Sequence, residues 1–132
     1  MSNPEGQEVQ ARLDELIAAT RKGSFQWRAV NPTTYLWERG DPLRGGPRLT
    51  LQRVEQNVVQ RPPGGPPTPA RQVFFILQVF DIKPNNPQMP LLTVSGSNDP
   101  QMNQKLEELF QLVTSGITQQ SLEFLKNLIS EV

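Results

Sequence analysis

The sequence predicts a small α+β fold: an N-terminal helix, then a four- to five-stranded, mainly antiparallel sheet, then two C-terminal helices packed on one face of that sheet. Three observations favour this order. Apolar residues recur at helical spacing in residues 7–20 and again in residues 102–129. Between these stretches lie short runs rich in β-branched and aromatic residues, and segments rich in Pro, Gly and Asn separate the runs. With 132 residues and no internal repeat, we expect a single domain over residues 1–132.

The strongest strand candidate is the segment 73–80, which reads VFFILQVF. It is apolar except for Gln78, and most of its residues are β-branched or aromatic. Because it lies between Pro69 and Pro84, it is too short for a buried helix. We therefore expect an interior strand, covered either on both faces or on its core face with a partly covered outer face.

The N-terminal helix is predicted to begin at Asn3 and Pro4, which suit a cap and a first helical position, and to end at Gly23. Its firm part begins near residue 7. Its apolar residues form one stripe, so this helix is expected to pack against the sheet along a single face. The stripe consists of Val9, Leu13, Leu16 and Ile17, and Thr20 continues it.

Two short strands are predicted next, at residues 25–30 and 33–38, separated by Asn31 and Pro32. They form either a hairpin or one bent strand. A longer strand follows at residues 48–59, and its apolar positions change parity along its length. This change predicts a bulge or a twist near Gln52–Arg53. The apolar positions are Leu49, Leu51, Val54 and Val58.

A Pro/Gly-rich loop is predicted at residues 60–70, which contain five prolines and two glycines. Such a composition favours an irregular, extended connection, and we expect it to join two antiparallel neighbouring strands. Residues 83–90 form a second predicted turn, and residues 91–95 a last short strand.

The C-terminal region is predicted to contain two helices. Asp99 and Pro100 suit the start of the first helix, and Gly116 is expected to end it. Thr118 is then expected to cap a second helix, with Ile117 as a hydrophobic staple. The apolar residues of residues 119–132 cover a wide arc instead of one stripe. Two explanations stay open: this segment is wedged between the sheet and the preceding helix, or another chain covers part of its arc.

Composition bears on the chemistry that the chain can perform. Cysteine and histidine are both absent. Disulfides, zinc–thiolate sites and cysteine nucleophiles are thereby excluded, and the commonest general base and metal ligand are missing. The carboxylates show no spacing that implies a catalytic pair or a metal site; Glu107 and Glu108, for example, are adjacent on a helix and point in different directions. We therefore expect no enzymatic activity, no cofactor and no metal.

The N-terminal sequence and the hydropathy favour a cytoplasmic protein without a membrane segment. No signal peptide is visible, and no apolar run approaches the roughly 20 residues that cross a bilayer.

The net charge is zero, with 13 basic and 13 acidic residues. The basic residues gather in the middle of the sequence, where residues 21–71 carry nine of them against three acids.

The leading functional hypothesis is a non-enzymatic protein-interaction module that binds either another protein or a second copy of itself, as a homodimer. This hypothesis is based on the excess apolar surface of residues 119–132. The predicted contact residues are Phe124, Leu128 and Val132. A second route to a partner is strand addition at a sheet edge near residues 25–30.

The alternative hypothesis is a domain that binds single-stranded nucleic acid, in which aromatic side chains stack on bases and arginines contact phosphates. The balanced net charge argues against it. A third hypothesis, a small-molecule binder or hydrolase, requires a deep pocket with converging carboxylates. The candidate nucleic-acid residues are Trp27, Arg28, Tyr35, Trp37, Arg48 and Arg53.

Overall fold

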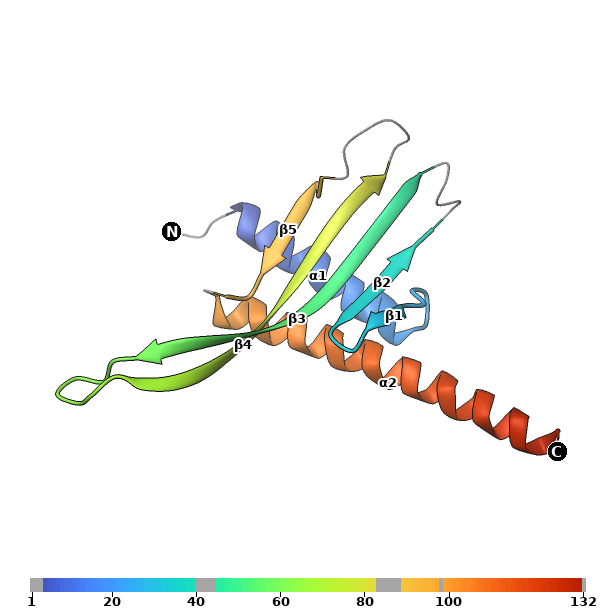
Figure 1. The fold of residues 1–132 in the computed structure, drawn as a ribbon. Helices are drawn as coiled ribbons and strands as arrows, with labels where there is room; N and C mark the ends of the chain where they lie inside the picture. Colours follow the sequence, from blue (N-terminus) through green and yellow to red (C-terminus); the bar gives the residue numbers. More distant parts are fainter. Residues whose placement is uncertain (1–3, 40–44, 83–88, 98, 132) are drawn as a thin grey trace.

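The computed structural model describes residues 4–39, 45–82, 89–97 and 99–131. Helix α1 (Pro4–Arg21) comes first, five strands follow, and helix α2 (Pro100–Ser130) ends the described chain. The strands form one antiparallel sheet in the order of the sequence, and both helices lie across the same face of it (Figure 1). The predicted α+β class and antiparallel sheet are therefore confirmed. The strands are β1 (Arg28–Asn31), β2 (Thr34–Glu38), β3 (Gly46–Gln60), β4 (Thr68–Ile82) and β5 (Leu92–Ser95).

The core lies between the sheet and the two helices. Helix α1 contributes Leu13 and Ile17, which belong to its predicted stripe and are buried. The sheet and the first half of α2 contribute the rest, and each buried side chain removes apolar surface from water. The main buried cluster comprises Leu13, Ile17, Trp27, Tyr35, Leu51, Phe75, Leu77, Val94, Met102, Leu106, Leu109 and Val113.

Strand β4 occupies an interior place in the sheet, between β3 and β5. Phe75 and Leu77 point to the helices and are buried, whereas Ile76 and Phe80 point to the opposite face and are half-buried. The prediction of an interior strand is confirmed, in the form that has one covered and one partly covered face.

The strand boundaries differ from the prediction in two places. The first strand begins at Arg28, three residues later than expected, so Phe25 and Trp27 precede it. Of the bulge or twist predicted near Gln52, the bulge is wrong, because β3 and β4 keep one unbroken register from Gly46–Ile82 to Gln60–Thr68. A register shift occurs instead between Ala29 and Asn31 of β1.

The loop predicted at 60–70 is shorter than expected. Strand β3 continues to Gln60 and β4 begins at Thr68, so only residues 61–67 are irregular. The strands that flank this turn are antiparallel neighbours, as predicted. Pro69 is tolerated in β4 because each strand of a two-stranded ribbon has one unpaired edge, where a missing N–H costs no ladder bond.

The prediction of two C-terminal helices is wrong. A single helix, α2, runs from Pro100 to Ser130 through Gly116 and Thr118. Its start is as predicted, because the Asp99 carboxylate accepts the Met102 backbone N–H at 3.1 Å. Gly116 does not adopt a left-handed conformation, and a glycine inside a helix costs only about 1 kcal/mol relative to alanine. That cost is too small to end a helix whose flanking residues favour it, so Ile117 and Thr118 are interior helix residues.

Candidate interaction surface

The second half of α2 extends away from the rest of the domain (Figure 1). The buried residues of the helix all lie in its first half, and Ile117 is the last residue that packs against the core. Every residue from Thr118 to Glu131 is exposed. We call residues 118–131 the α2 tail.

Five large apolar side chains of the α2 tail face solvent. At 100° per residue they occupy one arc of about 160° around the helix. Gln119, Glu123 and Lys126 occupy the opposite side of the helix. The exposed fractions are 66% for Phe124, 65% for Ile129, 56% for Leu122, 51% for Leu125 and 43% for Leu128.

The wide arc of the α2 tail is therefore not buried by its own chain. Of the two explanations left open by the sequence, wedging between the sheet and the preceding helix is wrong, because no other described element covers residues 118–131. Two serine hydroxyls of the tail donate to carbonyls four residues earlier, as helical geometry allows, with Ser121 to Ile117 at 2.9 Å and Ser130 to Lys126 at 3.0 Å. The tail is a formed amphipathic helix with an uncovered apolar face.

Two of the three predicted contact residues, Phe124 and Leu128, lie on this face, four positions apart. Val132 lies outside the described residues. The structure gives less support to the second predicted contact, strand addition at the sheet edge near residues 25–30. Strand β1 is one of the two edge strands and its residues are exposed, with Val30 at 58%, but it is only four residues long.

The aromatic residues that a nucleic-acid site would require are largely inside the molecule. Trp27 is 5% exposed and Tyr35 is 7% exposed. The Trp27 indole N–H points at the Thr20 hydroxyl at 3.4 Å. Trp37 is half-buried and packs on Phe25, with ring centroids 4.7 Å apart. Base stacking on Trp27 or Tyr35 would require these rings to leave the core.

The arginines of the same hypothesis are paired with carboxylates. Arg28 contacts Glu38 at 2.7 Å and Arg48 contacts the other oxygen of Glu38 at 3.2 Å. Arg53 is paired with Glu55. The structure therefore brings Arg28 and Arg48 together around one acid, but it does not combine them with exposed aromatic rings into a stacking surface.

The described residues form no cluster of three or more acidic side chains that could hold a metal ion. An apolar cleft of about 220 Å³ lies between α1 and strands β3–β5, and Glu8 is the one carboxylate among the described residues that line it. Glu8 is paired with Arg12 at 2.8 Å.

In the described part of the chain, no helix is long and apolar enough to cross a membrane.

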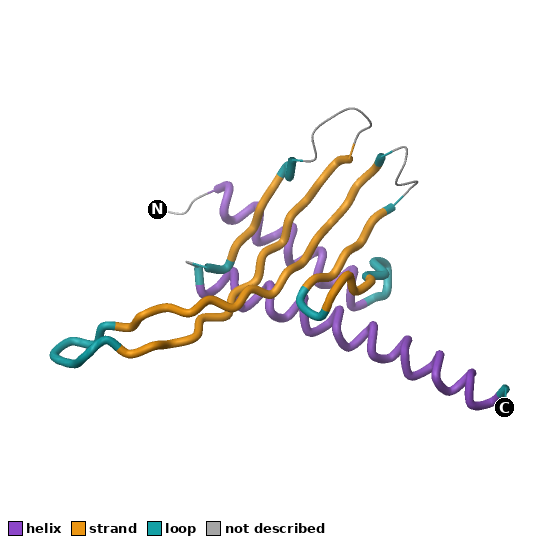
Figure 2. Tube along the Cα trace, in the orientation of Figure 1, coloured by secondary structure: helices purple, strands orange, loops and turns teal. Residues whose placement is uncertain are grey.

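A second projecting element was not anticipated as a site. Strands β3 and β4 continue beyond the sheet as a two-stranded ribbon, on the side opposite the α2 tail (Figure 2). Strand β2 pairs with β3 only up to Gln52, and β5 pairs with β4 only from Ile76. We call residues 54–60 and 68–74, with the turn between them, the β3–β4 arm. The signal in the sequence was the parity change near Gln52, which predicted a bulge or a twist and not a ribbon that leaves the sheet.

Comparison of the chain with protein-family models, with curated proteins and with solved structures found no match.

Proposed function

We propose that this protein is a non-enzymatic interaction module that associates with a second copy of itself, and that the α2 tail is the contact surface. The observation that carries the proposal is the uncovered arc of five large apolar side chains on one formed helix. An exposed apolar patch rimmed by polar residues is typical of a protein–protein interface. Phe124 and Leu128 are the central residues of the proposed contact.

The apolar area of the tail is large enough to matter energetically. Full burial of a large apolar side chain contributes about 1.5–3 kcal/mol relative to exposure. Each of the five tail side chains keeps between 43% and 66% of its surface in water. Covering them would recover on the order of 5 kcal/mol, before the entropy cost of association.

A second copy would supply the burial that the tail lacks, because its own chain leaves the apolar arc in water. A segment of this length is marginally helical in water by itself, and burial of an apolar face is what usually stabilises it. Two copies would bring identical faces into one assembly, and closed two-fold dimers are the commonest form of homo-oligomer.

The proposal is tested by measuring mass in solution over a wide concentration range, by sedimentation or light scattering. We expect the native chain to gain mass with concentration and the Phe124→Asp variant to stay a monomer. Gln119→Asp is the matched control, because it places the same charge on the opposite side of the tail, and it should associate as the native chain does. A native chain that stays monomeric at all concentrations would refute the proposal.

A further inference from the structure

The β3–β4 arm has two chemically different faces. Strand alternation and the unbroken register place eight residues on one face, and none of them is charged. The opposite face, which is continuous with the helix-covered side of the sheet, carries Glu55 and Arg71. The uncharged face consists of Val54, Gln56, Val58, Gln60, Thr68, Ala70, Gln72 and Phe74.

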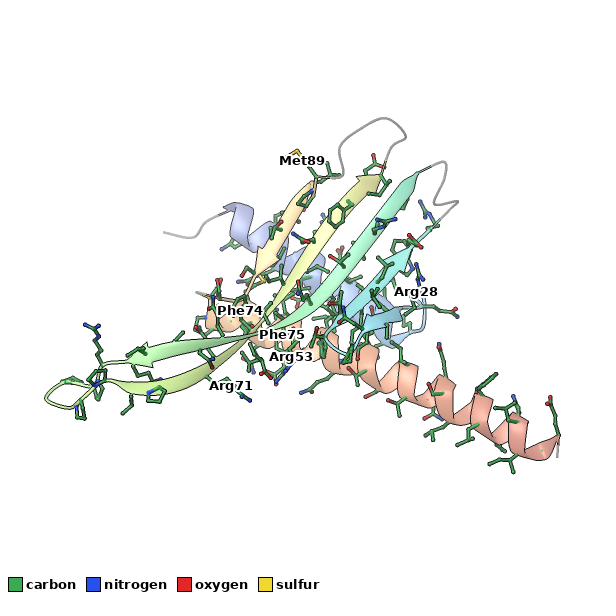
Figure 3. All side chains as sticks on the ribbon, viewed as in Figure 1. Arg28, Arg53, Arg71, Phe74, Phe75 and Met89 are labelled. Carbon is green, nitrogen blue, oxygen red and sulfur yellow. The ribbon has the colours of Figure 1, made fainter. Side chains whose placement is uncertain are left out.

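Two apolar residues of β3 change faces where the arm begins. Within the sheet, Leu49 and Leu51 point to the helices. In the arm, Val54 and Val58 point to the opposite side although the register does not change, whereas Val59, which is 65% exposed, stays on the charged face. Phe74, opposite Val54 in the ladder, is only 7% exposed and stands outside the main core cluster (Figure 3). The base of the uncharged face is therefore covered by its own chain, and Gln72 there donates to the Ser97 carbonyl at 3.2 Å. Farther out, Val58 and Ala70 are half-buried, and a partner on this face would complete their burial.

An isolated two-stranded hairpin is marginally stable in water, and packing against a helix is one of the arrangements that stabilise it. The α2 tail has the matching size. At a rise of about 1.5 Å per residue, its 14 residues span about 21 Å. At about 3.3 Å per residue, the seven residues of each arm strand span about 23 Å.

The shape of the tail also matches a ribbon better than another helix. A two-helix coiled coil buries a narrow seam made of every third and fourth residue. The apolar arc of the tail is about 160° wide, which suits the flatter surface of a β-ribbon. The uncharged face of the arm offers Val58 and Ala70 to such a helix without any charged group to desolvate.

On these grounds we propose that the uncharged face of the β3–β4 arm receives the α2 tail of a second copy. This inference rests on the proposed self-association and assigns the surface opposite the tail. The arm and the tail leave the domain on opposite sides (Figures 1 and 2). A two-fold axis perpendicular to the arm–tail direction would place each arm beside the other copy's tail, so that both contacts form at once.

The absence of cysteine from the chain makes disulfide mapping direct. One variant carries Leu125→Cys in the tail, and a second, affinity-tagged variant carries Val58→Cys on the uncharged face of the arm. When the two are mixed and oxidised, we expect a tagged mixed dimer as the main product. Asn57→Cys, one residue away on the charged face, is the matched control and should form at least about tenfold less of it because the two faces of a strand point in opposite directions.

Charge substitutions give a second measurement in the native disulfide-free state. Gln56→Asp places a charge on the uncharged face and should weaken self-association by at least about tenfold. Asn57→Asp places the same charge on the other face, opposite Arg71 in the ladder, and should leave self-association within about threefold of the native value.

The outcomes separate this inference from the proposed function. If Leu125→Cys forms disulfides with itself and none with Val58→Cys, while Gln56→Asp associates normally, the tails pair with each other; the arm assignment is then wrong and self-association stands. If no variant forms a disulfide and the native chain is monomeric, both proposals fail.

Discussion

Asn103 acts as a strand neighbour for Phe75: its side-chain Oδ1 accepts the Phe75 backbone N–H at 3.0 Å. The amide group of Asn103 also donates to the Val73 carbonyl at 3.4 Å, and the Gly96 N–H donates to the Phe75 carbonyl at 3.0 Å. These bonds satisfy backbone groups of β4 at the point where β5 has ended at Ser95. The first turns of α2 thus fasten the base of the β3–β4 arm to the domain.

Replacing Asn103 with alanine should therefore loosen the base of the arm. We expect the free energy of unfolding to fall by about 1–3 kcal/mol, because the Phe75 N–H and the Val73 carbonyl lose their partner. Chemical denaturation measures the loss, and amide exchange at Phe75 should accelerate. Gln104→Ala, an exposed neighbour on the same helix, is the control and should change stability by less than about 0.5 kcal/mol. Equal effects of the two substitutions would contradict this account.

Gly116→Ala tests whether α2 is one helix. A Cβ at this position meets no atom within 4 Å and the backbone is not left-handed. Alanine should therefore raise the free energy of unfolding by about 0.5–1 kcal/mol, through its better helix propensity. Chemical denaturation decides the sign. A loss of stability is the outcome expected if Gly116 ended the helix in a left-handed conformation, as the sequence pattern had indicated.

Two leucines of α2 should respond differently to truncation. Leu109 is fully buried, so Leu109→Ala should cost about 2–5 kcal/mol in the free energy of unfolding. Leu122 is 56% exposed, and Leu122→Ala should cost less than about 0.5 kcal/mol when the protein is dilute enough to be monomeric. At concentrations that favour assembly, the cost of Leu122→Ala should rise. A Leu122 cost that does not depend on concentration would show that this side chain has no place in a contact.

Glu55 should titrate at lower pH than an ordinary glutamate. Its pKa is lowered chiefly by the hydrogen bond and charge of Arg53 and to a smaller extent by Arg71. The stabilisation that this ion pair gives the folded arm is complete above the unfolded-state pKa and is lost as the pH falls through the lowered folded-state pKa.

Carboxyl chemical shifts recorded across acidic pH give the Glu55 pKa directly. Arg53→Gln should raise this pKa towards its ordinary value, and Arg71→Gln should raise it less, because the guanidinium of Arg71 lies farther away, at 3.6 Å. A Glu55 pKa that does not change in Arg53→Gln would disprove the assigned cause.

Local patterns in the sequence were sufficient to predict the helices and strands that the core stabilises. The apolar run at 73–80 predicted β4, and Leu13 with Ile17 predicted the buried face of α1, because burial fixes which positions must be apolar. The cap at Asp99 followed from a short motif with a known geometry. In these regions local preference and tertiary packing agree.

The errors arose where local signals were weak or had two causes. Gly116 predicted a helix end, but a single glycine also occurs inside a helix at a modest free-energy cost. The parity change before Val54 predicted a bulge or a twist, yet the register is unbroken there, and Val54 and Val58 point to the face of the ribbon opposite to that of Leu49 and Leu51. The wide arc of the α2 tail was recognised from the sequence, but only the structure showed that its own chain leaves it uncovered.

The continuity of α2 ties folding to assembly. One helix contains both the buried residues Leu106 and Leu109 and the exposed residues Phe124 and Leu128. If a second molecule binds the α2 tail, it also restrains the first half of the same helix, which is packed in the core. The protein would then act as its own stabilising ligand, and its melting temperature would climb as its concentration increases.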